Sequence, residues 1–393
     1  MKILYVGTLP PHPDGSAVAC WQLLRGLAGR GYLVRGLGPR SGKPPPVDPL
    51  SADGRLRITP FLVEQPLTSP DRPPSERYRA QERGAIERLV PELIERDRPD
   101  IALIGRESFA WYIPLVVDAE LPCVMQAHGT LTAGIVDGTY PQEEAERLLR
   151  CVRQANAVQV PAQHLARTLE SLGVRNVEVI RNGVDLELFR PRSRDTDLSQ
   201  TLRLAADDVV VAHFSNLKRL KRPMDVVESA EIALRRDARL LYVVVGDGAA
   251  RADMERACAQ KGISHRFRFV GWVDHATVPR YLSLADVVVM PSESEAQALI
   301  YLEAQASACT LVASDVPGAR TVVVDRETGL LCRVGDARDL AEKTLLAASS
   351  PELRAEIGRA ARDRVLTHSV KEIVEAHARL LERVVTETPA RTV

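Results

Sequence analysis

Residues 286–314 read DVVVMPSESEAQALIYLEAQASACTLVAS, in which a polar loop and a helical stretch separate two short apolar runs. This order is typical of a βαβ unit, whose two parallel strands are joined by a helix. Within the helical stretch 298–308, the apolar residues Leu299, Leu302 and Ala306 follow the i, i+3, i+7 spacing of one helix face. The sequence therefore predicts two buried strands and a helix that packs on them.

The apolar face of this helix also carries a carboxylate, Glu303, four positions after Leu299. An unpaired buried carboxylate is costly, so we expect a ligand hydroxyl, an arginine or water to bind it. A glutamate that faces the solvent is the alternative, because Glu is seldom buried. Glu295 precedes Glu303 with seven residues between them. Along an ideal helix the two would lie about 12 Å apart, a distance that spans a nucleotide sugar.

Strands and helices alternate in this way along both halves of the chain. The alternation predicts an α/β protein of two Rossmann-like domains, each a doubly wound parallel sheet, that face a cleft. In the first half we expect strands at 3–7, 101–105, 123–127, 157–160 and 177–180, and helices at 17–28, 82–97, 143–154 and 163–172. In the second half we expect strands at 209–214, 240–246, 267–271, 286–290 and 310–314.

The boundary between the domains is expected at a polar segment, 189–208, whose lack of apolar period is typical of a linker. This gives an N-terminal domain over 1–188 and a C-terminal domain over 209–368. Two Pro-rich stretches, 41–54 and 66–76, are expected to form exposed loops. Ligands of such domains bind at the carboxyl ends of the strands, so the loops that follow strands are the candidate sites.

Composition excludes several classes of function. Lys and Arg together number 52, as do Asp and Glu, so no overall field attracts nucleic acid or an anionic membrane. The apolar run in MKILYVGTLP is too short for a secretory signal or a membrane span, and we expect a cytoplasmic protein. The six cysteines form no CxxC pair, which disfavours a zinc site or a disulfide framework. We expect no metal site.

Two loops of the second half suit a phosphate. The segment HFSNLKRLKRPMD, 213–225, places Lys218 and Lys221 after a strand, where they can clamp a diphosphate; a solvated charged face is the alternative. The turn GDGAAR contains Gly246 and Gly248. These glycines bring the backbone close to a ligand, or they form an ordinary turn from strand to helix.

Two loops of the first half are also candidates. Gly15 and Ser16 precede a helix whose first amide groups can hold an anion or a sugar oxygen, although such a turn is as often only a cap. His128, in MQAHGT, follows a strand end beside a glycine. A histidine there serves either catalysis or the structure.

Together these motifs resemble those of the retaining GT-B glycosyltransferases of family 4. The resemblance covers nearly the whole chain through AHGT, VIRNGVDLELF, VVVGDG, FVGWV, PSESEAQALIYLEA and VPGARTVVVDRETGLL. The combination of NGVD with two glutamates spaced by seven residues is specific. Within the family, SNLKRLKRPMD and PSESE are most similar to the N-acetylglucosaminyl malate synthases of bacillithiol biosynthesis.

The resemblance implies a role for each candidate in the second half. Lys218 and Lys221 would hold the diphosphate, and Glu303 would hold the ribose of the nucleotide. Glu295 would bind the 3-hydroxyl or 4-hydroxyl of the donor sugar. The further donor-binding residues that it implies are Asn216, Gly246, Gly248, Trp272, Val273, Ala296, Gln297, Ala298 and Leu299.

For the first half, the resemblance places His128 near the 6-hydroxyl of the sugar. With the two lysines and Glu295, His128 would make up the catalytic set. Gly15 and Ser16 would approach the phosphates and the acceptor. Such enzymes need no catalytic metal and no protein nucleophile, because a phosphate oxygen takes the proton of the acceptor. A last helix, 369–388, would cross back to the first domain.

The loop after Glu295 departs from the family pattern. Relatives usually read EGFGL, whereas here Ala296 and Ala298 replace two glycines and Gln297 replaces a phenyl ring. Downstream, Thr321 stands where the family motif GGxPE has a glutamate. The donor sugar therefore stays open, an unusual sugar included. The departures suit a specialised pathway, such as the synthesis of a sugar-containing antibiotic.

The expected function is thus retaining, metal-independent transfer of a sugar from a UDP-linked or GDP-linked donor to a small soluble acceptor, with no other cofactor. Biosynthesis of a low-molecular-weight thiol or of an antibiotic is the expected context. Two alternatives share the fold: a non-hydrolysing UDP-sugar epimerase, which the spacing of the glutamates disfavours, and a non-catalytic nucleotide-sugar-binding protein. The sequence leaves the oligomeric state open, a homodimer included.

Overall fold

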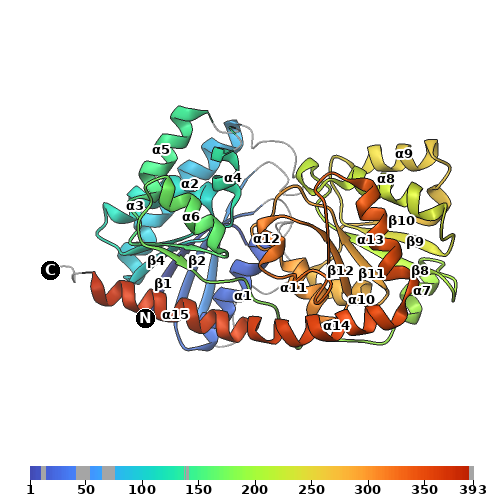
Figure 1. Cartoon of the computed structure of the whole chain (residues 1–393). Helices are drawn as coiled ribbons and strands as arrows, with labels where there is room; N and C mark the ends of the chain where they lie inside the picture. Colours follow the sequence, from blue (N-terminus) through green and yellow to red (C-terminus); the bar gives the residue numbers. More distant parts are fainter. Residues whose placement is uncertain (10–14, 41–53, 64–75, 137, 139–140, 389–393) are drawn as a thin grey trace. The chain divides into compact units, whose positions relative to one another are not determined.

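The structure is a computed structural model that describes residues 1–9, 15–40, 54–63, 76–136, 138 and 141–388 (Figure 1). It divides into two compact units: unit 1 is Met1–Asn182 with Val370–Val393, and unit 2 is Gly183–Ser369. The two Pro-rich stretches, 41–54 and 66–76, lie almost entirely outside the described residues.

Unit 1 contains a seven-stranded sheet in the order β3-β2-β1-β4-β5-β6-β7, in which every neighbouring pair is parallel. Ile3 of β1 lies opposite Val34 of β2 and Ile101 of β4. The strands are β1 (Lys2–Val6), β2 (Leu33–Arg40), β3 (Leu56–Leu62), β4 (Ile101–Ile104), β5 (Cys123–Gln126), β6 (Ala157–Val160) and β7 (Val177–Val179). The α-helices are α1 (Gly15–Gly29), α2 (Glu76–Asp97), α3 (Ile113–Val117), α4 (Thr130–Val136), α5 (Gln142–Val152), α6 (Gln163–Ser171) and α15 (Val370–Glu387), with a 3₁₀-helix η1 (Glu107–Tyr112).

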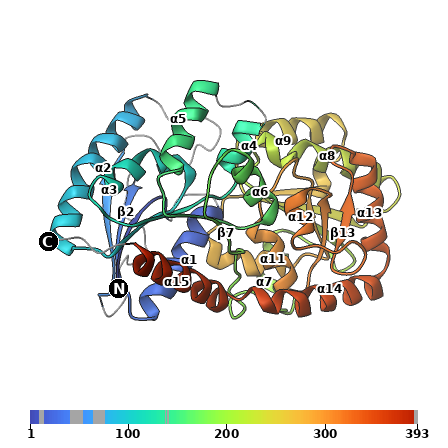
Figure 2. The ribbon, with the colours of Figure 1, turned by 60° about the vertical axis from the view of Figure 1, so that its left-hand side comes forward.

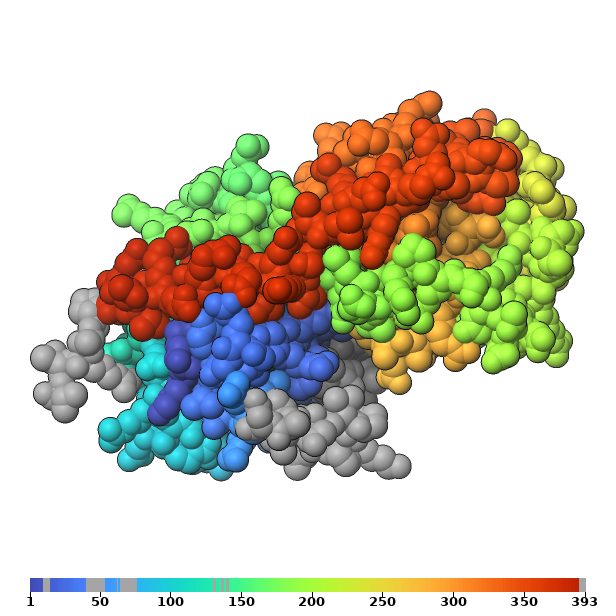
Figure 3. Space-filling view, turned by 90° about the horizontal axis from the view of Figure 1, so that it is seen from below, coloured from blue at the N-terminus to red at the C-terminus, as the bar shows by residue number. Residues whose placement is uncertain are grey.

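The last helix, α15, packs against α1 of unit 1 (Figures 1 and 3). Its buried side chains Val374, His377 and Ala378 follow the spacing of one helix face, which contacts the core of the sheet. Gly26 of α1 allows the two helices to approach, because a Cβ there would lie 2.3 Å from Cγ2 of Val374. The C-terminal residues of the chain are therefore part of unit 1.

Unit 2 contains a six-stranded parallel sheet in the order β10-β9-β8-β11-β12-β13. Its strands are β8 (Val209–Phe214), β9 (Leu240–Val245), β10 (Phe267–Gly271), β11 (Val287–Met290), β12 (Thr310–Ser314) and β13 (Leu330–Cys332). Its α-helices are α7 (Thr196–Thr201), α8 (Pro223–Leu234), α9 (Arg251–Gln260), α10 (Val278–Leu282), α11 (Leu299–Ala306), α12 (Pro317–Arg320), α13 (Ala337–Ser349) and α14 (Pro351–Val365). Short 3₁₀-helices are η2 (Arg219–Lys221), η3 (Ser264–Arg266), η4 (His275–Thr277) and η5 (Leu366–His368).

Helices cover both faces of the sheet of unit 2 (Figure 2). In β8, Val210 and Ala212 point into one hydrophobic core, whereas Val209 and Val211 point into the other. Every residue of this strand is buried, as expected for a central parallel strand with helices on each side. The prediction of two parallel, doubly wound sheets is confirmed.

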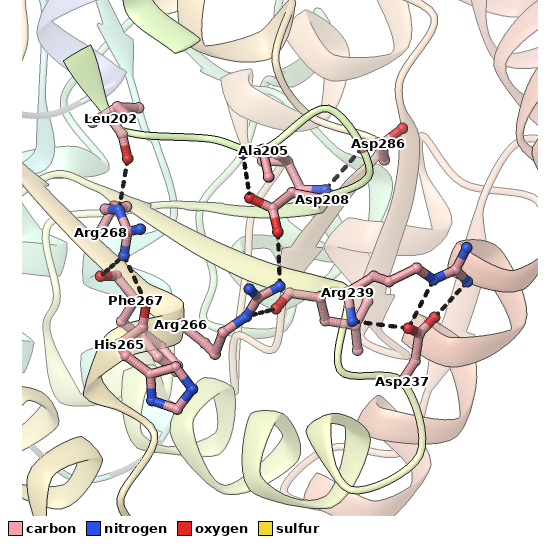
Figure 4. Close-up of polar contacts among 12 residues, drawn as sticks. Leu202, Ala205, Asp208, Asp237, Arg239, His265, Arg266, Phe267, Arg268 and Asp286 are labelled. Atoms are coloured by element: carbon pink, nitrogen blue, oxygen red, sulfur yellow. Dashed lines mark hydrogen bonds and ion pairs between the residues drawn. The ribbon is translucent and has the colours of Figure 1, made fainter. Parts of the chain in front are cut away.

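The segment 189–208, for which the sequence predicts a linker, lies inside unit 2. Arg266 donates to Leu240 O at 2.8 Å and to the carboxylate of Asp208 at 2.8 Å, and Arg268 donates to Leu202 O at 2.6 Å (Figure 4). Phe189 is completely buried in the core of this unit. Polar contacts and one short helix, α7, hold the segment. Polar contacts of this kind leave no apolar period in the sequence, so the sequence pattern does not predict them. The structure divides the chain instead after Asn182 and after Ser369.

No helix among the described residues is both long enough and apolar enough to cross a bilayer.

Candidate functional site

The centre of unit 2 is a topological switch point, where the strand order runs outward from β8 on one side and from β11 on the other. Loops that follow two such strands diverge and leave room for a ligand at the carboxyl edge of the sheet. The loop after β8 carries Asn216, Lys218 and Lys221, and the loop after β11 carries Glu295. The fold thus brings these candidates from both loops to one edge of the sheet.

The loop after β8 is fixed by a buried histidine. His213 Nδ1 donates to Val289 O at 2.9 Å, so Nε2 is left to accept a hydrogen bond from Ser215 Oγ at 2.8 Å. Ser215 Oγ in turn accepts from Leu217 N at 3.1 Å. Burial lowers the pKa of His213 to about 4, and the charge of Lys221 contributes, so this ring is neutral near pH 7.

Glu295 and Lys221 form an ion pair across the two loops. Lys221 Nζ lies 2.7 Å from Glu295 Oε1, and the side chains are 22% and 7% exposed. A carboxylate this deeply buried needs a cation, and the lysine supplies it. The structure therefore brings together the residue expected at the diphosphate and the residue expected at the sugar.

Glu303 is buried on the inner face of α11, as the helix pattern predicts. Its partner is His275, whose Nε2 lies 2.6 Å from Glu303 Oε1. Burial lowers the pKa of His275, but the hydrogen bond to Glu303 and the charges of Glu303 and Asp185 outweigh it, so the pKa lies above its usual value. The ring of His275 packs on Phe189, with ring centroids 5.2 Å apart.

Three glycines allow loops at this edge to pack backbone against backbone. A Cβ on Gly246 would lie 1.8 Å from Ser215 O, and one on Gly248 would lie 2.0 Å from Asn216 O. A Cβ on Gly318 would lie 2.0 Å from Glu295 O. Gly246 and Gly248 are therefore required by contact with the protein itself, whatever ligand also approaches them.

The departures from the family pattern contact each other. Gln297 is buried, and its Nε2 donates to Thr321 Oγ1 at 3.3 Å. Thr321 Oγ1 donates to Gly318 O at 2.7 Å, and Gly318 is the residue that packs on the backbone of Glu295. Gln297 thus ties the loop of Glu295 to α12. The neighbouring residues Ala296, Ala298 and Leu299 are half-buried, and Ala298 is the N-cap of α11.

The remaining candidates of unit 2 differ in exposure. Trp272 is 52% exposed and Val273 is half-buried, both in the loop between β10 and η4. Lys218 is half-buried at the start of η2. Asn216 Oδ1 is buried, and no donor of the described residues forms a hydrogen bond to it.

The candidates of unit 1 lie at the carboxyl edge of their own sheet. His128 is half-buried after β5, and its Nε2 lies 3.7 Å from Cys20 Sγ of α1. The next residue, Gly129, donates its N–H to the carboxylate of Glu107 at 2.5 Å. Gly15 and Ser16 form the first turn of α1, where Gly15 is exposed and Ser16 half-buried.

Sequence reasoning missed His275 and His213. Both lie at or just after the carboxyl end of a strand, which is the criterion that singled out His128. Their partners Glu303 and Val289 are distant in the sequence, so the pairing becomes visible only in the fold. Among the described residues, no group of three or more His, Cys, Asp or Glu is placed to hold a metal ion.

Comparison with known proteins assigns the family. Residues 195–364 match the model of the glycosyl transferases group 1, and residues 13–188 match that of Glycosyltransferase Family 4. The chain belongs to the group 1 glycosyltransferases. The family that the sequence motifs indicate is thereby confirmed.

This glycosyltransferase is 27% identical over 289 residues to the N-acetyl-alpha-D-glucosaminyl L-malate synthase of Bacillus anthracis, over 72% of the chain and 74% of that relative. It is 30% identical over 284 residues to the D-inositol 3-phosphate glycosyltransferase of Saccharomonospora viridis, over 68% of the chain and 64% of that relative. The chain thus covers about two thirds to three quarters of the length of these two relatives.

Solved structures with the GT-B fold are similar to the glycosyltransferase over nearly its whole length. The sucrose-phosphate synthase of Thermosynechococcus elongatus matches with a TM-score of 0.81 at 21% identity, over 98% of this chain and 100% of that one. HepE of Anabaena in complex with UDP and glucose matches with a TM-score of 0.78 at 18% identity, over the same shares. At such identities the likeness shows the fold alone.

Proposed function

We propose that this glycosyltransferase moves a sugar from a UDP-linked or GDP-linked donor to a small soluble acceptor, with retention and without a catalytic metal. The pairing of Glu295 with Lys221 supports the proposal. The carboxylate that we propose for the sugar and the ammonium that we propose for the phosphate lie 2.7 Å apart at the switch point of unit 2. An anionic and a hydroxyl-bearing group of one ligand can therefore bind side by side.

The diphosphate would take Lys221 as its counterion, since a charge-assisted contact to phosphate gains strength where water is excluded. Ala298, at the N-cap of α11, carries no side-chain acceptor, so the first amide groups of that helix are available to an anion. Lysine charge and helix amides together would stabilise the leaving phosphate. In this proposal the charge of Lys221 and the amide groups of α11 stabilise the negative charge that a metal ion stabilises in other transferases.

The nucleotide would bind through Glu303, whose carboxylate can accept from two neighbouring ribose hydroxyls. Asn216 Oδ1 offers a further buried acceptor to a donor group of the ligand. HepE of Anabaena has been solved with UDP and glucose, which supports a nucleotide sugar in this fold.

In the transfer step we propose, the bond between the anomeric carbon and the phosphate oxygen breaks. The acceptor oxygen bonds to the anomeric carbon on the face from which the phosphate departs. The acceptor proton moves to a phosphate oxygen of the leaving nucleotide, so the atoms balance without a protein nucleophile. Glu295 is paired with Lys221 and would orient the sugar by a hydrogen bond to its hydroxyls.

The relatives support a small acceptor, because their names specify L-malate and inositol 3-phosphate. Biosynthesis of a low-molecular-weight thiol or of a sugar-containing antibiotic is the context that we propose. The changed loop of Ala296, Gln297 and Ala298 leaves the donor sugar to be identified by experiment.

The test compares Lys221→Met with Lys371→Met, which changes an exposed lysine of α15. Transfer is measured by mass spectrometry with UDP-linked and GDP-linked sugars and a panel of small hydroxyl acceptors. We expect the wild type and Lys371→Met to form a glycosylated product, and Lys221→Met to lose at least about 100-fold in kcat/KM. Isomerised donor without transfer would identify an epimerase instead, and binding without any turnover would identify a non-catalytic binder.

A further inference from the structure

His275 and Glu303 form a contact between two separate elements of unit 2. His275 opens η4, just after β10, and Glu303 lies in the middle of α11. Nε2 of the histidine is 2.6 Å from Oε1 of the glutamate, and the side chains are 28% and 7% exposed. The histidine side of the contact is thus more exposed than the glutamate side.

The imidazole itself is held in place from behind. Phe189, completely buried, contacts the ring with centroids 5.2 Å apart and planes inclined by 53°. Phe189 N donates to Asp185 O at 2.8 Å, and Arg362 donates to Phe189 O at 3.1 Å. The packing and these backbone contacts restrict where the ring of His275 can lie.

The hydrogen bond limits how the carboxylate of Glu303 can rotate. A carboxylate offers about four lone-pair directions, of which the imidazole N–H occupies one on Oε1. Oε2 and the second lone pair of Oε1 are left for two further donors in a fixed plane. Two neighbouring hydroxyls of a ribose have the spacing and the donor groups to use both oxygens.

We infer that His275 is a positioning residue, which orients the Glu303 carboxylate for the ribose of the donor nucleotide. The inference rests on the proposed function, because it assumes that a nucleoside diphosphate binds at α11. Holding the carboxylate in advance reduces the freedom that it loses when the nucleotide binds. His275 contributes in this way without touching the sugar that is transferred.

The test measures dissociation constants by calorimetry for UDP and for 2′-deoxy-UDP. The proteins are the wild type, His275→Leu, His275→Gln and His265→Leu, the last being an exposed histidine of η3. In the wild type and in His265→Leu, UDP binds more tightly than its deoxy analogue. In His275→Leu, UDP should lose about 10-fold in affinity while the deoxy analogue changes little, because the lost hydrogen bond acts through the ribose.

His275→Gln keeps an N–H donor and should restore most of the preference for UDP. His275→Asn, whose amide is too short to reach Glu303, provides the same comparison as the leucine variant should that variant not fold. An unchanged preference for UDP in the leucine and asparagine variants, or an equal loss for both nucleotides, would overturn the positioning role. If the wild type bound GDP and not UDP, the same comparison is made with GDP and 2′-deoxy-GDP. If the wild type bound neither UDP nor GDP, the donor site itself would be refuted, and the role of His275 with it.

Discussion

Two buried carboxylates, Glu295 and Glu303, each have a nitrogen partner from another element, Lys221 and His275 respectively. The sequence pattern predicts the burial of Glu303, because the residue shares a helix face with Leu302 and its apolar neighbours. It does not predict the partner, because a periodicity reports the environment of one element only. The pairing depends on how η4 and α11 come together in the fold.

The ion pair of Lys221 and Glu295 should be strongly coupled. Removing the lysine leaves a buried carboxylate without a cation, so we expect Lys221→Met to destabilise the protein by about 2 kcal/mol. Adding Glu295→Gln should recover about half of this loss. Urea unfolding of the two single variants and the double variant measures the coupling energy.

The exposed pair of Arg236 and Glu342, with side chains 55% and 52% exposed, is the control. Its coupling energy should stay below about 1 kcal/mol, because solvent screens both charges. A coupling no larger at Lys221 and Glu295 would show that solvent screens the site pair as well.

The hydrogen bond between Gln297 and Thr321 should matter for the sugar and not for the nucleotide. Thr321→Val keeps the shape of the side chain but removes the hydroxyl that bonds Gln297 and Gly318 O. We expect an unchanged affinity for UDP and a loss of about 10-fold in kcat/KM, because the loop of Glu295 loses its anchor. Thr386→Val, at an exposed position of α15, should change neither value.

At the scale of the elements, the sequence predicts some strands and not others, and the position in the sheet does not decide which, because β10 lies at a sheet edge and β2 does not. β8, β10 and β12 have the bounds expected from their β-branched and apolar runs. β2, β3 and β13 were missed. Gly36, Gly38 and Pro39 interrupt the pattern of β2, although Gly38 is required there because a Cβ would lie 2.7 Å from Gly7 O. β13 has only three residues, too few for a period to appear.

The contact between the loops after β8 and β9 should depend on Gly248. A methyl group there would collide with Asn216 O, so Gly248→Ala should destabilise the protein by about 3 kcal/mol and weaken UDP binding. Gly84→Ala is the opposite case, because nothing lies within 4 Å of its Cβ in the middle of α2. This variant should gain up to about 1 kcal/mol. Denaturation curves of both variants decide the sign of each effect.

At the scale of the whole molecule, each unit contains a buried neutral histidine at the carboxyl edge of its sheet or beside it. His377 Nδ1 donates to Ile373 O at 2.9 Å, so its Nε2 accepts from Gln126 at 3.3 Å in unit 1. Burial lowers the pKa of His377 to about 4, and that of His213 in unit 2 likewise. Protonation would place two donors against each other at Gln126 and charge a buried ring.

Both units should therefore lose stability in mild acid. The folded pKa values lie below the usual value of 6.5, so the stabilisation is complete above about pH 6.5 and is lost as the pH falls toward 4. Each histidine should account for a loss on the order of 3 kcal/mol. His377→Gln should flatten the pH dependence of urea unfolding for unit 1, whereas the exposed control His265→Gln should leave it unchanged.

The account as a whole depends on a nucleotide sugar binding to unit 2 through α11. A crystal structure of the protein with UDP tests this most directly, by the distance between the Glu303 carboxylate and the ribose hydroxyls. We predict hydrogen bonds from both ribose hydroxyls to Glu303, with the diphosphate beside Lys221 and the first turn of α11. A nucleotide bound with its ribose away from Glu303, or with its diphosphate away from Lys221, would contradict the account.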